Sequence, residues 1–223
     1  MAVYTPCAIA AKQATREIPI VTLAGDPLGI GLVPSLNRPG ENITSVSLMA
    51  AELSGKCVEI IHDLLPNAQR IAALASAKDP FSKPFLEQVR LAGKNTGVEI
   101  APAIMVSKTD ELDGAFSAMK KQEATAVIVQ ASLSLKNAAE LALRHHLPAV
   151  SVPRSFPELG GLLSYGLDGP DTFRRSADFV IKIMQGGEQP TKFELVINLK
   201  TARALGLSIP GSFLLRADRF SRD

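Results

Sequence analysis

Residues 70–76 read RIAALAS, and two similar apolar runs follow, VEIAPAIMV at residues 98–106 and AVIVQAS at residues 126–132. They begin at intervals of roughly 28 residues, which is the length of one strand, one helix and two loops. Short runs rich in Val, Ile and Ala that alternate with amphipathic stretches predict a mostly parallel β-sheet flanked by helices. The sequence therefore indicates an α/β protein.

Working outward from this centre, we predict further strands and helices from the same signals. The additional strands are expected at residues 18–24, 147–152, 161–166 and 193–199. Helix start and stop residues predict helices at about residues 6–16, 27–36, 52–65, 80–96, 109–121, 134–146 and 171–185. Asp79 is predicted to cap one of these helices, with Pro80 at its first position and Gly97 at its end.

The composition of the 223 residues excludes several classes of protein. Hydrophobic residues make up 46% of the chain, aromatic residues only 5%, and Trp is absent, as expected for a core of Ala, Val, Ile and Leu. A net charge of +2 without a basic block argues against a nucleic-acid partner. Cys7 and Cys57 are too few for a disulfide framework. No apolar run approaches the length of a membrane span, and the first residues lack the layout of an export signal.

The segment GDPLGIG at residues 25–31 resembles the nucleotide-binding loop of short-chain dehydrogenases, since it follows a predicted strand and opens a predicted helix. That chemistry also needs a Tyr four residues before a Lys. Tyr4 and Tyr165 are followed at that spacing by Ala8 and Gly169. We therefore favour a structural role for the loop, in which Asp26 and Pro27 start a helix and the glycines permit close packing.

Two other patterns receive structural interpretations. His145 and His146 are adjacent at a predicted helix end, where positive charge is favourable, and no third metal ligand stands at a supporting spacing. We predict no metal site and no cofactor. Asn42 begins a formal glycosylation triplet with Ile43 and Thr44, which we interpret as a chance match.

Polar residues follow the predicted strands at the positions where those strands end. In open α/β sheets, ligands bind outside the carboxyl ends of the strands, so these residues together suggest a cleft for a small molecule. Helix N-termini at this edge would favour an anionic group such as a carboxylate. The residues in question are Thr5, Gly25, Asp26, Asp79, Ser132, Arg154, Ser155, Ser164 and Tyr165.

Several blocks of the sequence resemble a family of ABC-transporter substrate-binding proteins, whose members include tryptophan- and phenylalanine-binding relatives. The most specific block is TKFELVINLKTA at residues 191–202, followed by ALGL at 204–207 and IP at 209–210. Further matching blocks, in the same order along the chain, are GDP at 25–27, RPG at 38–40 with NIT at 42–44, and GGLLSYG at 160–166. The resemblance covers essentially the whole chain.

This resemblance implies a two-lobed α/β protein of the periplasmic-binding-protein type I fold, which closes over a small ligand outside the cell. One lobe would hold residues 1–47 with 167–190, and the other residues 48–166 with 191–223. By analogy, the ligand-binding residues would be Thr5, Asp26, Asp79, Ser132, Arg154 and Tyr165. The implied partners are a small organic ligand, most simply an amino acid, and a membrane permease. The implied location is periplasmic or at the membrane surface.

Family members carry an export signal and about a hundred further residues before the position that matches Met1. The first lobe is therefore expected to be incomplete, with about two strands, a size at which a core rarely supplies more than about 3 to 5 kcal/mol. Its exposed sheet edge would favour a homodimer. We interpret the chain as an N-terminally shortened member of the family.

The leading hypothesis is a non-enzymatic solute-binding protein that works by hinge closure. The alternative is a nucleotide-dependent oxidoreductase that uses residues 25–31. A third hypothesis, a ligand-sensing regulatory domain of the same fold, would need a fused signalling or DNA-binding segment.

Overall fold

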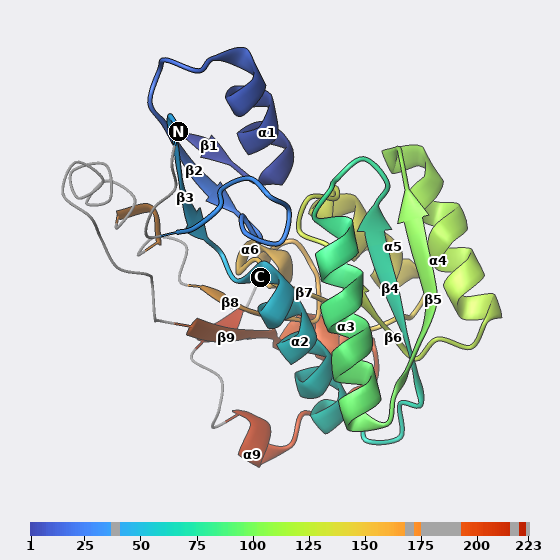
Figure 1. The fold of residues 1–223 in the computed structure, drawn as a ribbon. Helices are drawn as coiled ribbons and strands as arrows, with labels where there is room; N and C mark the ends of the chain where they lie inside the picture. The colour runs from blue at the N-terminus through green and yellow to red at the C-terminus, as the bar shows by residue number, and fades with distance from the viewer. Residues whose placement is uncertain (37–40, 168–171, 175–192, 215–218, 222–223) are drawn as a thin grey trace.

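The computed structural model describes residues 1–36, 41–167, 172–174, 193–214 and 219–221. Within them the chain forms two separate sheets, one of three strands and one of seven (Figure 1). Both are built mainly from parallel strands, with helices packed against them, so the predicted α/β class is confirmed. No helix in these ranges is long and apolar enough to cross a membrane.

The three-stranded sheet belongs to what we call the N-terminal unit, which comprises residues 2–36 and 41–47. Its parallel strands are β1 (Ala2–Val3), β2 (Ile20–Ala24) and β3 (Ile43–Ser47), with β2 in the centre. Helix α1 (Thr5–Ala14) connects β1 to β2 and packs against them. The sequence predicted about two strands here. It missed β1, because a strand of two residues leaves no pattern, and it predicted no strand at residues 43–47.

The predicted helix at residues 27–36 is wrong. Asp26 does begin a turn, because its Oδ1 accepts the Gly29 N–H at 2.9 Å. The following amides bond back at short range, as in the Leu32 N–H to Pro27 carbonyl bond of 2.9 Å, and the chain forms turns rather than a helix. Gly31 has a φ of 67°, a left-handed conformation that ends any helical path.

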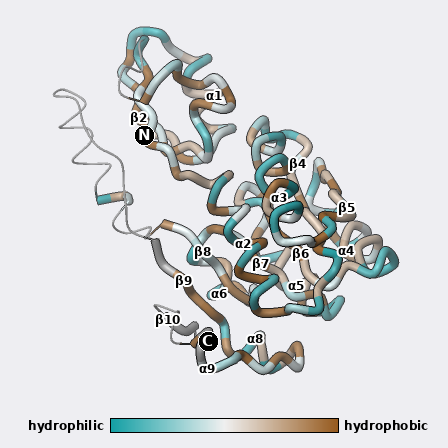
Figure 2. Tube along the Cα trace, turned by 60° about the horizontal axis from the view of Figure 1, so that its bottom comes forward, coloured by the Kyte–Doolittle hydropathy of each residue, from teal (hydrophilic) through white to brown (hydrophobic). Residues whose placement is uncertain are grey.

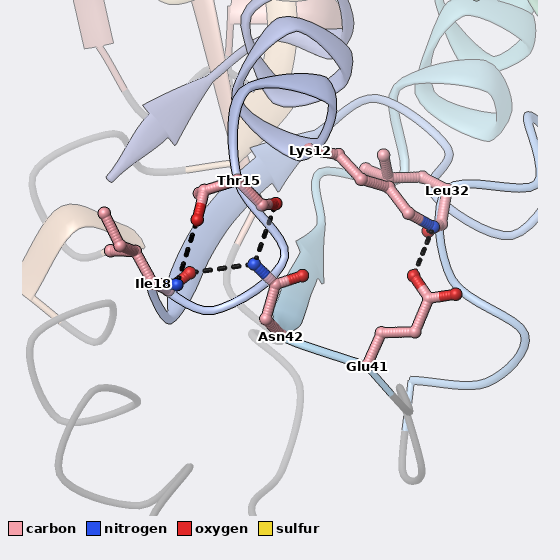
Figure 3. A network of polar contacts seen from close by, with 6 residues as sticks. All are labelled: Lys12, Thr15, Ile18, Leu32, Glu41 and Asn42. Carbon is pink, nitrogen blue, oxygen red and sulfur yellow. Dashed lines mark hydrogen bonds and ion pairs between the residues drawn. The ribbon is translucent and has the colours of Figure 1, made fainter.

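Polar contacts hold the loops of the N-terminal unit together (Figure 3). The Asn42 amide nitrogen donates to the carbonyls of Thr15 at 3.1 Å and Ile18 at 2.9 Å. Lys12 Nζ donates to the Leu32 carbonyl at 2.9 Å and pairs with Glu41 at 3.1 Å. The Asn42 nitrogen that a glycan would occupy is therefore used in structural hydrogen bonds.

The seven-stranded sheet forms the core of what we call the main unit, which comprises the described residues from Ala50 to Leu167 and from Phe193 onward. Its strand order is β10-β9-β8-β7-β6-β4-β5, and only the β8–β9 pair is antiparallel. The strands are β4 (Arg70–Ser76), β5 (Glu99–Val106), β6 (Ala126–Val129), β7 (Ala149–Ser151), β8 (Leu163–Leu167), β9 (Phe193–Asn198) and β10 (Arg219–Ser221).

Helices cover both faces of this sheet. The strands themselves include hydrophobic stretches, as Figure 2 shows for β9. One face packs against α2 (Ala50–Leu64) and α3 (Ser82–Thr96). The other packs against α4 (Leu112–Lys121), α5 (Leu135–Arg144) and α6 (Ser155–Glu158). The short 3₁₀ helix η1 (Thr109–Glu111) precedes α4, and α8 (Leu199–Ala204) and α9 (Gly211–Leu214) follow β9.

The burial of the central strands explains why their inner positions, such as residues 71–75 of β4, are all apolar. In β4, Ile71, Ala73 and Ala75 point into the core under α2 and α3, while Ala72 and Leu74 point into the core on the opposite face. A strand buried on both faces cannot alternate between apolar and polar residues. The run RIAALAS is therefore typical of a strand in the centre of a sheet.

Two predicted helix starts need correction. Helix α3 begins at Ser82, two residues after the predicted first position at Pro80, and Gly97 ends it as expected. Thr109 starts the 3₁₀ turn η1, and α4 begins only at Leu112. Of the helix predicted at 171–185, residues 172–174 are helical and the rest lie outside the described residues. The same holds for most of residues 167–190, which the sequence assigned to the first lobe.

Candidate functional site

A cavity of about 460 Å³ lies between the N-terminal unit and the main unit. On one side it is bounded by residues at the ends of β1 and β2, including Thr5, Leu23 and Gly25. On the other side it is bounded by loops that follow the carboxyl ends of β4, β6 and β7. This is the sheet edge at which ligands of open α/β folds bind.

Four of the six predicted ligand-binding residues line this cavity: Thr5, Asp79, Ser132 and Arg154. Asp26 is not among the lining residues, because its carboxylate turns back to cap Gly29. Tyr165 is half-buried and packs against the core of the main unit. The structure thus brings four predicted residues together and places two elsewhere.

Asp79 is the buried carboxylate of the cavity, with only 5% of its surface exposed. Its Oδ1 accepts a hydrogen bond from the Phe81 N–H at 3.0 Å, and its Oδ2 accepts one from the side-chain amide nitrogen of Gln130 at 2.9 Å. The Gln130 Oε1 in turn accepts the Ser76 N–H at 2.8 Å and the Ser82 hydroxyl at 2.7 Å. The network fixes the position of the carboxylate, and within the described residues no cation forms an ion pair with it.

Two further polar groups border the same space. The Arg154 side chain is about three-quarters buried, with its Nε 3.9 Å from Glu158 Oε1, and both residues line the cavity. The Ser132 hydroxyl oxygen is buried and has no hydrogen-bond partner among the described residues. A buried hydroxyl without a partner is costly unless a ligand or water supplies one.

Most of the remaining lining is apolar, and sequence reasoning did not anticipate it. Leu23, Leu48, Phe81, Val152 and Phe173 contribute side chains to the cavity. Phe81 falls within the helix predicted at residues 80–96, but it precedes α3 and, although buried, borders the cavity. Its position directly after the Asp79-Pro80 loop was the one available signal. Nothing in the sequence pointed to Leu48 or Leu23.

Tyr4 adds a strained backbone at the rim of the cavity. It has a φ of 69°, and its N–H donates to the Leu23 carbonyl at 2.8 Å. Left-handed conformations at residues other than glycine cost of order 1 kcal/mol or more and cluster at ligand sites. Tyr4 is the single residue that connects the end of β1 at Val3 to the start of α1 at Thr5.

Two mainly parallel sheets on either side of an apolar cavity with a few converging polar groups define a cleft-type protein for binding small molecules. The oxidoreductase alternative loses its main support, since residues 25–31 open no helix that could bind a phosphate. The family model for ABC transporter substrate binding proteins matches residues 1–221, and the chain belongs to this family. The members of this family bind substrates and are not enzymes.

Individual relatives agree with this assignment. The tyrosine-binding protein of Clostridioides difficile (strain R20291) is 25% identical over 217 residues, which cover 92% of this chain and 62% of the relative. The chain therefore spans less than two thirds of that protein's length.

Among solved structures, a conserved domain protein from Vibrio cholerae is 27% identical with a TM-score of 0.87, over 98% of this chain and 77% of that one. An ABC domain from Streptococcus pneumoniae in complex with L-Trp is 26% identical with a TM-score of 0.86, over 98% and 79%. The predicted type I periplasmic-binding-protein fold is confirmed.

Proposed function

We propose that this chain is the solute-binding component of an ABC-type importer, and that its ligand is an amino acid with a large apolar side chain. The observation that supports this most directly is Asp79, a buried carboxylate in an apolar cavity with no cation paired to it among the described residues. A buried charge is costly unless an opposite charge compensates it. The ammonium group of an amino acid would supply that charge.

The other end of an amino acid has matching groups in the same cavity. The Arg154 guanidinium can bind a carboxylate through two parallel hydrogen bonds, a geometry that Lys does not offer. The buried Ser132 hydroxyl can donate to the same group. The ligand therefore needs both a cationic and an anionic group, a few ångströms apart.

The apolar lining selects the side chain. The rings of Phe81 and Phe173 with Leu48 offer surfaces for an aromatic or long aliphatic group, and a volume of about 460 Å³ accommodates one of that size. The relatives support this choice, since one is described as binding tyrosine and another was solved with L-Trp. Family membership supports delivery of the ligand to a membrane permease.

A thermal melt with L-tryptophan, L-tyrosine, L-phenylalanine and NAD(P) tests the proposal. A ligand at a hundred times its Kd should add about 2.7 kcal/mol, which corresponds to a shift of roughly 5 to 10 °C. We expect this shift with one of the amino acids and none with NAD(P). Indole-3-propionate lacks the ammonium group and tryptamine lacks the carboxylate, so both should bind far more weakly than L-tryptophan.

The variant Asp79→Asn removes the charge while retaining the shape of the side chain. We expect it to weaken amino-acid binding about 30-fold or more, as measured by calorimetry. Asp110→Asn, at an exposed position in η1, is the matched control and should bind like the parent protein. Unchanged affinity in a folded Asp79→Asn protein, or equal binding of indole-3-propionate, would contradict the role of Asp79.

A further inference from the structure

Gly25 lies at the point where the N-terminal unit is attached to the main unit. It follows β2 directly, and its carbonyl accepts the N–H of Ala50, the first residue of α2, at 2.9 Å. The preceding carbonyl, of Ala24, accepts the Leu48 N–H at 2.8 Å. The chain crosses between the two units at Leu48 and Met49, so Gly25 sits beside the crossing as well as in the cavity wall.

The aromatic ring of Phe81, from the main unit, lies directly against Gly25. A Cβ atom at position 25 would be 2.9 Å from Phe81 Cε2, 3.0 Å from Cδ2 and 3.1 Å from Cζ, closer than ordinary contact allows. Gly25 has no positive φ, in contrast to Gly31, so its backbone conformation is open to other residues. Glycine is therefore required here for space, because the ring occupies the volume of a side chain.

The Phe81 ring has little freedom to move away. It is buried, and it packs against the fully buried Phe85 with the ring centroids 6.5 Å apart and an interplanar angle of 51°. Its own N–H is bonded to the Asp79 carboxylate, which Gln130 holds from the other side. A side chain at position 25 would therefore have to displace the N-terminal unit rather than the ring.

We propose that the contact between Gly25 and Phe81 sets how far the cleft can close, and that it makes Gly25 a positioning residue for the ligand. The absence of a side chain lets the two units approach to the separation at which both line the cavity. Asp79 binds the ligand and also holds the loop that carries Phe81, so ligand binding and closure act on the same loop. The inference rests on the proposed function in assuming that the cleft closes on a ligand and that Asp79 binds this ligand.

Distance measurements between the two units test this directly. Cys7 is exposed on α1 of the N-terminal unit, and Cys57 is fully buried, so one added cysteine at the exposed Lys136→Cys position on α5 gives a specific label pair. Pulsed electron paramagnetic resonance would compare Gly25→Ala, Phe81→Leu and the double variant with the parent, each with and without L-tryptophan. Gly114→Ala is the control, because nothing lies within 4 Å of a Cβ there.

We expect Gly25→Ala to lengthen the distance between the units and to weaken L-tryptophan binding about 5- to 100-fold. In the double variant, Phe81→Leu removes the ring, so the shorter distance between the units should be restored. Phe81→Leu alone should broaden the distance distribution, and this variant decides the question if Gly25→Ala does not fold. Distances in Gly25→Ala equal to those in Gly114→Ala, or a parent protein without a short-distance population, would overturn the inference.

The same data separate the two proposals. If Gly25→Ala lengthens the distance while no amino acid affects the parent protein, the closure contact stands and the proposed ligand is wrong. If an amino acid shortens the distance equally in the parent, Gly25→Ala and Gly114→Ala proteins, the ligand stands and the role of Gly25 is wrong.

Discussion

The main unit and the N-terminal unit are both built from alternating strands and helices, but the extent to which these elements are buried differs greatly between them. In the main unit, β6 is buried at every residue and helices cover both faces of the sheet. In the N-terminal unit, β1 is only half-buried, and the core is one small cluster that includes Ala8, Leu32 and Ile43. The main unit therefore supplies most of the apolar burial, whereas the N-terminal unit supplies one wall of the cavity.

This difference suits a cleft that opens and closes. A large core resists local opening, and a small one with few buried apolar contacts moves or unfolds at lower free energy. The polar groups of the site that need exact positions, Asp79 and Gln130, lie in the main unit, where their network is buried. The N-terminal unit contributes mainly backbone and apolar groups at Val3, Tyr4, Leu23 and Gly25.

The two cysteines give the largest expected contrast between the units. Burial raises the pKa of Cys57 from its ordinary value of 9.0 to about 12, outweighing the opposing effect of a backbone hydrogen bond with Tyr165. At pH 8 its thiolate fraction is therefore about a thousandth of that of an ordinary thiol. Iodoacetamide should modify Cys7 readily and Cys57 only in denaturant, as read by mass spectrometry. Similar rates for both would show that the main unit opens readily.

A core truncation in the main unit should have the next largest effect. Phe116 is fully buried on α4 under the sheet, so Phe116→Ala should lower the free energy of unfolding by about 3 to 5 kcal/mol in urea denaturation. Leu91→Ala on α3 is the control, because 51% of Leu91 is exposed, and it should change stability by about 0.5 kcal/mol or less. A loss below about 1 kcal/mol for Phe116→Ala would contradict the burial assigned to this face.

The corresponding truncation in the N-terminal unit should have a smaller and local effect. Leu32→Ala removes a buried side chain from the small cluster, at a cost of about 2 kcal/mol. Hydrogen exchange should show faster exchange of the β2 amides, while the β6 amides keep the protection of the parent protein. Equal loss of protection in β2 and β6 would mean that the two units unfold as one.

The sequence predicted the main unit well because its central strands are buried on both faces, so that residues 71–75 of β4 and all of β6 are apolar. β4 coincides with the predicted run at residues 70–76, and the predicted strand starting at 126 matches the start of β6. It predicted the N-terminal unit poorly, since β1 is too short to show a pattern. The Asp26-Pro27 pair, which often starts a helix, instead starts a turn that Gly31 continues.

The candidate site shows the same limit. Asp79, Ser132 and Arg154 were found because polar residues after buried strands meet at one sheet edge, which is a rule of topology. Tyr165 was included although it lies within the predicted strand at residues 161–166, and its side chain packs against the core. Phe81 and Leu48 were missed because an apolar residue gives the same signal whether it faces a core or a cavity.

The sequence by itself determined the α/β class, the family and the set of polar residues at the strand ends, because these depend on local periodicity and on short-range patterns. Only the tertiary structure decided which of those residues face the cavity and why position 25 must be glycine. The physical reason is that a cavity is formed by segments distant in sequence: the ring that fills the space beside Gly25 belongs to Phe81, and no local pattern records their contact.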